Sequence, residues 1–154
     1  MSPPRRMLRP CARTDTLPPM AAFLFKTEPS TYAFADLARE KHAVWDGVSN
    51  PVALRNLRAV KKGDTVLIYH TGSEKAVVGL ASAASDAYPD PKDRTGRLVV
   101  VDLAAGRALK RPVPLSTFKT DATLRTVAMV RQPRLSVMPI SAAQLERVLH
   151  LAGG

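Results

Sequence analysis

The segment from Trp45 to Pro51 combines an aromatic ring with short polar side chains. Trp45 is the only tryptophan of the chain, and it is followed by Asp46, Ser49 and Asn50. A nucleobase offers a flat face for stacking and edges for hydrogen bonds, so an indole beside polar groups suits base recognition. The alternative is that the indole fills the core, as large aromatic rings commonly do in small domains.

Arginines that can hold phosphate occur in two places. Arg55 and Arg58 belong to a predicted helix, and Arg131 and Arg134 lie in a proline-bearing loop nearer the C-terminus. Guanidinium groups bind phosphate in a bidentate manner, so both pairs are candidates for contacts to a nucleic-acid backbone. A solvated basic surface without a ligand is the alternative.

Further polar residues stand where predicted strands end. Lys26, Thr27 and Glu28 close the first strand, and Tyr69 and His70 close a later one. At the mouth of a barrel a lysine can reach a phosphate or carbonyl, and a glutamate can accept from a base amino group, although a surface ion pair would use the same residues. Because side chains alternate along a strand, one of the two rings is expected in the core.

The sequence gives little support to catalysis. The candidate serines lack the GxSxG context that exposes a nucleophile, and no carboxylate is apparent as a partner for His70. Glu28, Asp46 and His70 can act as an acid and base set only if the fold brings them together. We therefore expect no catalytic residues. A hydrolase acting on nucleic acid or nucleotides, and a module binding small molecules or proteins, remain the alternatives.

Composition argues against several other classes. Cys11 is the only cysteine, and the three histidines have no metal-ligand spacing, so neither an internal disulfide nor a metal site is predicted. No Walker-type loop or GxGxxG pattern occurs, and we expect no cofactor. No apolar run approaches the ~20 residues of a membrane-spanning helix, so we expect no membrane partner and a cytoplasmic protein, or a nuclear one in a eukaryote.

The charge of the chain favours a polyanionic partner. The formal net charge is +10, and residues 20–154 alone hold 19 Lys and Arg against 12 Asp and Glu, a net charge of +7. Such an excess favours nucleic acid through counterion release, although it also suits a merely soluble surface. Residues 1–19 hold five prolines and four arginines, which predicts a disordered tail or a misannotated extension before Met20. Residues 20–154 are long enough for one domain, for which we expect a monomer.

Hydrophobic periodicity predicts an α+β domain built on a small, mostly antiparallel barrel or strongly curved sheet. Strands are expected over residues 21–26, 64–70, 76–84 and 98–103, and the prolines at 112 and 114 bracket an edge-like segment. Helices are expected over 33–41, from Asn50-Pro51 to Gly63-Asp64, and after a capping box of Ser141 and Gln144. Residues 115–119 suit one helical turn, and 122–129 suit helix and strand equally.

Several blocks of the sequence, in this order, resemble the EVE domain family. They include residues 23–29 (FLFKTEP), 45–50 (WDGVSN) and 134–139 (RLSVMP), with Tyr32 and Tyr69-His70 among the matching positions between them. The resemblance spans residues 20 to 150. It implies a PUA-like pseudo-barrel with flanking helices that holds a modified base of DNA or RNA in a pocket without altering it.

The resemblance also implies a set of site residues. Carried over by position, the contacts to the base would come from Phe23, Lys26, Thr27, Glu28, Trp45, Asn50, Tyr69, His70 and Ser136, with Arg131 on the same closing loop. The family usually has Trp in place of Phe23 and Arg in place of Ser49, and the loss of that planar cation can change affinity or ligand choice. The implied mechanism extrudes one base into the pocket, so single-stranded or destabilised sites should be preferred.

Overall fold

The computed structural model describes residues 21–153. The predictions for residues 1–19 and for Met20 therefore lie outside the described part of the chain. The strands are β2 (Ala22–Thr27), β3 (His42–Trp45), β4 (Thr65–His70), β5 (Ala76–Ala83), β6 (Tyr88–Pro89), β7 (Val99–Pro114) and β8 (Val137–Ile140). The helices are α1 (Phe34–Glu40), α2 (Pro51–Arg58), α3 (Leu115–Thr120), α4 (Ala128–Arg131) and α5 (Ala142–Leu151).

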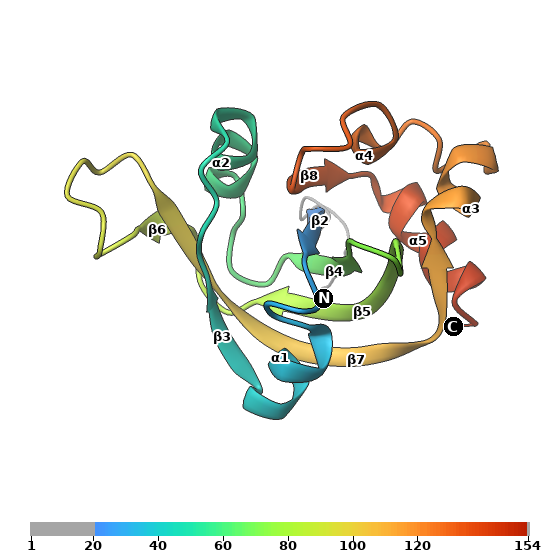
Figure 1. The fold of residues 1–154 in the computed structure, drawn as a ribbon, viewed down its shortest axis with the longest axis horizontal. Coiled ribbons are helices and arrows are strands. Elements are labelled where there is room, and N and C mark those ends of the chain that lie inside the picture. The colour runs from blue at the N-terminus through green and yellow to red at the C-terminus, as the bar shows by residue number, and fades with distance from the viewer. Residues whose placement is uncertain (1–20, 154) are drawn as a thin grey trace, which may run out of the picture.

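The strands form one mixed sheet of seven strands in the order β3-β7-β5-β4-β2-β8, with β6 paired to β7 (Figure 1). β2 pairs with β4 in parallel, and the other pairs are antiparallel. The sheet curves strongly, but its end strands β3 and β8 do not pair, so the barrel stays open. The prediction of an α+β domain on a curved, mostly antiparallel sheet is confirmed.

Strand β7 is longer than the sequence indicated. It runs for 16 residues through Gly106 and Pro112, where a break was expected. Its first residues pair with β6 and then with β3, pairing with β5 begins at Leu103, and from Ala105 onward β7 pairs with β5 alone. Since this last part has a free edge, it tolerates a residue without an N–H group. The predicted strand over 98–103 and the edge-like segment around Pro112 are therefore parts of one strand.

Three short strands were not predicted: the two-residue β6, and β3 and β8 at the two ends of the sheet. β3 holds four residues and ends at Trp45, and β8 begins directly after Ser136. Their positions at the two edges of the sheet put both of them beside the opening of the barrel. The segments carrying Trp45 and Arg134 thus approach this opening from opposite edges.

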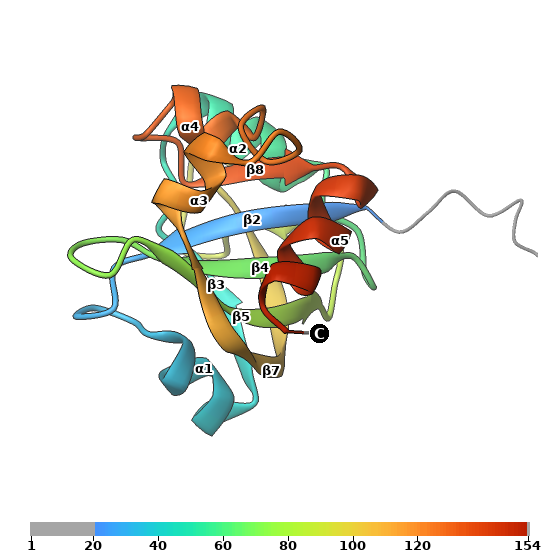
Figure 2. The same cartoon turned by 90° about the vertical axis from the view of Figure 1, so that its right-hand side faces the viewer.

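The helices begin at residues that satisfy their free N–H groups. Asn50 Oδ1 accepts from the N–H groups of Val52 and Ala53 at the start of α2, as predicted, but the helix ends at Arg58 rather than at Gly63. Ser141 and Gln144 form the predicted capping box of α5. Of residues 122–129, only the last two are helical and belong to α4. Figure 1 shows α3, α4 and α5 grouped at the end of the molecule opposite β3 and β6, and Figure 2 shows α1 below the sheet.

The core fills the curve of the sheet. Its largest fully buried side chains come from strands and helices alike and include Phe25, Leu37, Leu57, Leu67 and Phe118. Because β2 runs between β4 and β8, its residues Phe23 to Phe25 are enclosed, and only its C-terminal end reaches the surface. That end carries Lys26 and Thr27.

Candidate functional site

Lys26 and Thr27 are neighbours in β2, but they line different cavities. Successive side chains of a strand point to opposite faces. Thr27 therefore lines a cleft toward β3, and Lys26 lines a smaller hollow toward α3 and α4. A third hollow lies between the start of α2 and the loop before β8. The predicted base contacts are distributed over these cavities rather than gathered in one.

The largest of the three cavities is a cleft of about 830 Å³ beside β3, which we call the indole cleft. It lies between the loop after β2 and the strand that ends in Trp45. Its lining consists of Thr27, Thr31, Tyr32, Glu40 and residues 42–47. A volume of this size is within the range of about 300–1,000 Å³ typical of small-molecule sites and is ample for one base.

The Trp45 ring forms part of the floor of the indole cleft. Trp45 is 8% exposed, and its ring packs on the ring of Phe25 with a centroid distance of 5.6 Å and an interplanar angle of 44°. Tyr32 meets it edge to face, at 6.2 Å and 79°. Trp45 is thus a core residue, which is one of the two alternatives that the sequence left open, and it also lines the cleft.

Tyr32 is a wall of this cleft that was not among the predicted site residues, although it lies among the positions that resemble the family. Its carbonyl accepts a hydrogen bond of 2.6 Å from Thr27 Oγ1, which ties it to the end of β2. Its hydroxyl donates to Glu40 Oε1. Burial and the neighbouring Glu40 carboxylate raise the pKa of Tyr32 to about 12, because both disfavour the phenolate.

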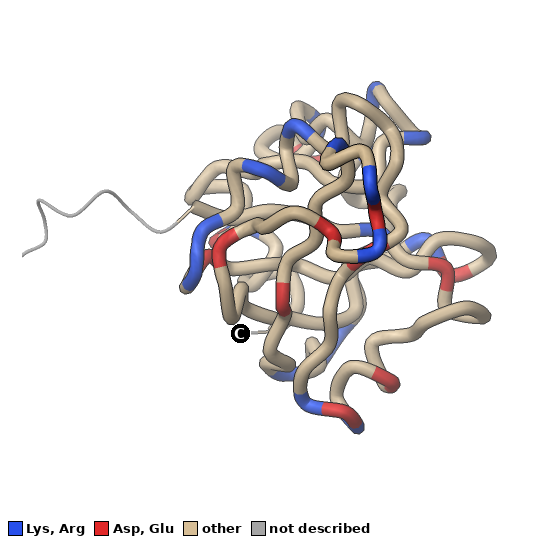
Figure 3. Tube along the Cα trace, turned by 90° about the vertical axis from the view of Figure 1, so that its left-hand side faces the viewer, with Lys and Arg blue, Asp and Glu red and all other residues tan. Residues whose placement is uncertain are grey.

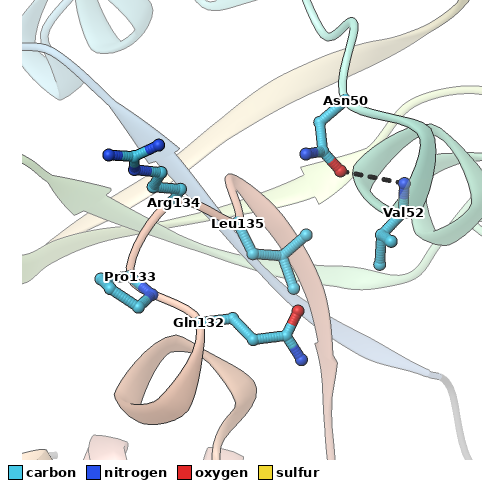
Figure 4. Close-up of a pocket in the computed structure, with 6 residues that line it drawn as sticks. All are labelled: Asn50, Val52, Gln132, Pro133, Arg134 and Leu135. Carbon is cyan, nitrogen blue, oxygen red and sulfur yellow. Dashed lines mark hydrogen bonds between the residues drawn. The ribbon is translucent and has the colours of Figure 1, made fainter.

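The second cavity, of about 350 Å³, holds Asn50 and Arg134 (Figure 4). We call it the asparagine hollow; its other lining residues are Val52, Gln132, Pro133 and Leu135. Asn50 Oδ1 lies 2.9 Å from Val52 N and 3.1 Å from Ala53 N, and these two donors identify it as the oxygen. The amide NH₂ has no hydrogen-bond partner among residues 21–153, so it remains able to donate to a ligand.

The third cavity, of about 210 Å³, is the lysine hollow, which includes Lys26, Tyr69, Lys75 and Met129. Lys26 Nζ lies 5.6 Å from the centre of the Tyr69 ring and donates to the carbonyl of Pro133. Burial lowers the pKa of Lys26, because the ammonium is partly removed from water. Pro133 also lines the asparagine hollow, so the two hollows are neighbours.

His70 is occupied by structural hydrogen bonds. Both rings at the end of β4 are buried, Tyr69 at 3% and His70 at 8% exposure, whereas alternation predicted only one in the core. A β-bulge between Ile68 and Tyr69 interrupts the alternation. His70 Nε2 accepts from Phe34 N at 2.9 Å, and Nδ1 lies 2.7 Å from Glu74 Oε1, which supplies the carboxylate partner that the sequence did not indicate.

The suggested acid and base set of Glu28, Asp46 and His70 does not come together. Glu28 accepts hydrogen bonds from Ser30 and from Thr71 in an exposed loop. Asp46 lines the indole cleft, which neither of the other two lines. The three residues therefore share no cavity in which a substrate could meet all of them.

Phe23 and Ser136 lie outside the lining of the three cavities. Phe23 is the second residue of β2, is 3% exposed and belongs to the core. Ser136 accepts a hydrogen bond of 2.9 Å from Lys26 N through its backbone carbonyl, which extends the pairing of β2 and β8. Ser136 therefore positions the C-terminal end of β2, whereas Phe23 anchors the strand in the core.

The four predicted phosphate contacts are exposed arginines. Arg134 lines the asparagine hollow, and Arg131 ends α4 next to it. Arg55 and Arg58 lie on α2, where Arg58 Nη2 donates to the carbonyl of Arg97 at 2.6 Å and keeps its other N–H groups. Figure 3 shows Lys and Arg positions gathered along the upper edge of the molecule, the edge to which α2 belongs in Figure 1.

Residues 21–153 offer neither a clustered metal site nor a membrane-spanning helix. They contain no group of three or more His, Cys, Asp or Glu side chains arranged to hold a metal ion. Their helices also include none that is both long and apolar enough to cross a membrane.

A strongly curved, open, mixed sheet with helices at its sides and cavities at its mouth defines a domain of the PUA-like class. Within that class, the chain belongs to the EVE domain family, whose model matches residues 21–151. Human thymocyte nuclear protein 1 is 28% identical over 163 aligned residues, which cover 84% of this chain and 72% of the relative.

Solved structures agree with this assignment. Rpa0253 from Rhodopseudomonas palustris is 34% identical, with a TM-score of 0.82, and the match covers 87% of this chain and 94% of the other. Human THYN1 in complex with 5-methylcytosine-containing DNA is 26% identical, with a TM-score of 0.78, and the match covers 87% of this chain and 98% of that one.

Proposed function

We propose that this protein binds nucleic acid without altering it and accepts one base, in modified form, in the indole cleft. Family membership supports the proposal, as does the similarity to human THYN1 in complex with 5-methylcytosine DNA. The main structural support for the proposal is the path of residues 45–50 along the surface. They run from the indole cleft, lined by Trp45 and Asp46, to the asparagine hollow, lined by Asn50.

In the proposed complex, the base enters the indole cleft beside Tyr32 and Trp45. Thr27 holds Tyr32 in place through its hydrogen bond to the carbonyl. The Asn50 NH₂ donates to the strand that carries the base, in the neighbouring hollow. The other predicted contacts belong to β2, β4 and the loops beside them and support the cleft from there, so not all of them touch the base; they are Phe23, Lys26, Glu28, Tyr69, His70 and Ser136.

The exposed arginines neutralise the phosphates of that strand. Arg134 and Arg131 lie on one side of the opening, and Arg55 and Arg58 lie on α2, which begins directly after Asn50. A helix rises 1.5 Å per residue, so α2 extends the contact by roughly 12 Å from the hollow, or three to four base steps. Phosphate contacts of this kind set affinity, whereas the cleft sets the choice of base.

The energy balance favours a strand that is already open. Extruding a base from a duplex costs about a few kcal/mol, and aromatic stacking returns roughly 1–3 kcal/mol per base. Since Trp45 is only 8% exposed, the return here belongs at the lower end of this range. We therefore expect tighter binding to a single strand or a mismatched site than to a fully paired duplex.

The test is a titration of labelled oligonucleotides, with cytosine or 5-methylcytosine at one position, followed by fluorescence anisotropy at two ionic strengths. The proposal expects stoichiometric binding that weakens with salt, favours the modified base and leaves the oligonucleotide intact. Binding that is indifferent to salt would indicate a module for small molecules or proteins. Turnover that disappears in His70→Ala or Glu28→Gln would instead indicate a hydrolase.

A further inference from the structure

The indole cleft has an unusual charge for this protein. The chain carries a net charge of +10, yet the cleft is lined by two carboxylates, Glu40 and Asp46, and by no lysine or arginine. The other ionisable groups of its lining are Tyr32 and His42. A negative cavity within a basic protein repels phosphate, so the backbone of a nucleic acid is directed to the basic rim and only a base is admitted.

The hydrogen bond from Tyr32 holds one of these carboxylates at the cleft. The Tyr32 hydroxyl donates to Glu40 Oε1, and Tyr32 is itself held by its hydrogen bond from Thr27 and by its edge-to-face contact with Trp45. A hydroxyl uses one lone pair of that oxygen, so Glu40 can still accept further hydrogen bonds. Asp46, directly after Trp45, is exposed and has no hydrogen-bond partner among the described residues.

Carboxylates next to aromatic rings favour a particular kind of base. Acidic side chains accept from the exocyclic amino group of cytosine, and a carbonyl at the same position would face them with its own negative end. Aromatic rings with nearby carboxylates also favour a cation over a neutral group of equal size. Both effects act in the same direction, toward a base whose edge is electropositive.

We infer that Glu40 and Asp46 make the indole cleft selective for electropositive bases, with a ring-methylated cationic base preferred over a neutral amino-bearing base, and that base preferred over one with a carbonyl. The inference rests on the proposed function, because it assumes that a base enters this cleft. It adds the charge of the base as the property that is read, and it names the two residues that read it.

Three single strands of thymidines test this inference. At one central position they carry 3-methylcytosine, 5-methylcytosine or thymine. The first two differ only in the place of one methyl group, which gives 3-methylcytosine a positive charge at neutral pH. 5-Methylcytosine and thymine have matching shapes and differ at two neighbouring positions, with an amino group against a carbonyl at C4 and an acceptor nitrogen against an N–H at N3. Single strands remove any difference in base pairing.

The expected order of affinity for the wild-type protein is 3-methylcytosine, then 5-methylcytosine, then thymine, with steps of about tenfold. Glu40→Gln keeps an acceptor for the Tyr32 hydroxyl, and Asp46→Asn keeps the size of the side chain. Because the two carboxylates share the preference, each substitution should reduce the ratio between the first two strands to about threefold. Glu146→Gln, a matched loss of charge at an exposed position of α5 outside the cavities, should leave the ratio unchanged.

The outcomes separate the inference from the proposed function. If all three strands bind equally, or if thymine binds best, the inference is wrong while nucleic-acid binding stands. If Glu40→Gln and Asp46→Asn weaken all three strands by the same factor, the carboxylates act on structure rather than selection, and the inference is again wrong. If the folded wild-type protein binds none of the strands, the proposed function fails and the inference fails with it.

Discussion

The backbone N–H of Phe34 donates a hydrogen bond of 2.9 Å to Nε2 of His70. This bond joins the first residue of α1 to the last residue of β4. Because Nε2 accepts and Nδ1 faces the Glu74 carboxylate at 2.7 Å, the hydrogen of the neutral ring lies on Nδ1. α1 connects Tyr32 to Glu40, two walls of the indole cleft, so this bond anchors the cleft to the sheet.

His70→Ala should lower the free energy of unfolding by about 1–3 kcal/mol, because a buried N–H loses its partner. Urea unfolding followed by circular dichroism measures this change. Glu74→Gln is the control, since it keeps the bond between Phe34 and His70 and alters only the outer, more exposed contact. Equal losses in the two variants would mean that the bond to Phe34 is not the main contribution of His70.

Trp45→Ala should lower the free energy of unfolding by about 3–5 kcal/mol, because the indole packs on Phe25 and is mostly buried. A loss of oligonucleotide binding in Trp45→Ala would therefore combine the loss of stability with the loss of contacts to the base. Trp45→Phe keeps part of the apolar contact and leaves a smaller cavity, so it should cost less than Trp45→Ala. Thermal unfolding of both variants checks this difference. If Trp45→Ala unfolds like the wild type, the indole does not support the core.

The tyrosines should titrate late in the folded protein. The chain has three, Tyr32, Tyr69 and Tyr88. Burial raises the pKa of Tyr69, the hydrogen bond to Asp102 raises that of Tyr88, and burial with Glu40 raises that of Tyr32 to about 12. Since the folded protein holds these protons more tightly than the unfolded chain, their contribution to stability is complete below pH 10. It is lost as the pH rises from 10 toward 12.

Tyrosinate absorbance measures this titration. We expect the last step of the folded protein to disappear in Tyr32→Phe and all steps to move to about pH 10 in denaturant. A wild-type protein whose three tyrosines all titrate near pH 10 while folded would contradict the hydrogen bond between Tyr32 and Glu40.

Replacing Arg131 and Arg134 together with glutamine should weaken oligonucleotide binding. It should also reduce the slope of log affinity against log salt by about 0.7 for each phosphate of a single strand that the protein no longer neutralises. Anisotropy titrations at several salt concentrations give this slope. Lys110→Gln on β7 is the control, because it removes an exposed charge outside the three cavities. An unchanged slope in the double variant would place these arginines outside the interface.

Much of the fold could be predicted because local patterns and tertiary packing agree. The cap of Asn50 on α2 and the capping box of Ser141 and Gln144 are local, and the structure has both. β3 and β8 could not be predicted from propensity, because each is four residues long and depends on pairing with a distant strand. The length of β7 depends likewise on its free edge near Pro112.

The resemblance indicated residues around the mouth of the barrel, but not their grouping. Lys26 and Thr27 belong to one block of the sequence, yet the pleat of β2 directs them to different cavities. Tyr32 is fixed at the cleft by its hydrogen bond to Glu40, and His70 is fixed by its hydrogen bond from Phe34. Neither contact could be predicted from spacing along the chain. Composition also concealed the acidic lining of the cleft, because the chain as a whole is basic.

The fluorescence of Trp45 tests the occupation of the indole cleft most directly, since it is the only tryptophan and reports on no other site. Titration with a 5-methylcytosine oligonucleotide should change its emission in a saturable manner, with one strand per protein and the same affinity as anisotropy gives. The matched oligonucleotide with an abasic position should bind through the arginines and leave the emission unchanged. If anisotropy reports binding of both strands while the emission of Trp45 responds to neither, no base enters the cleft.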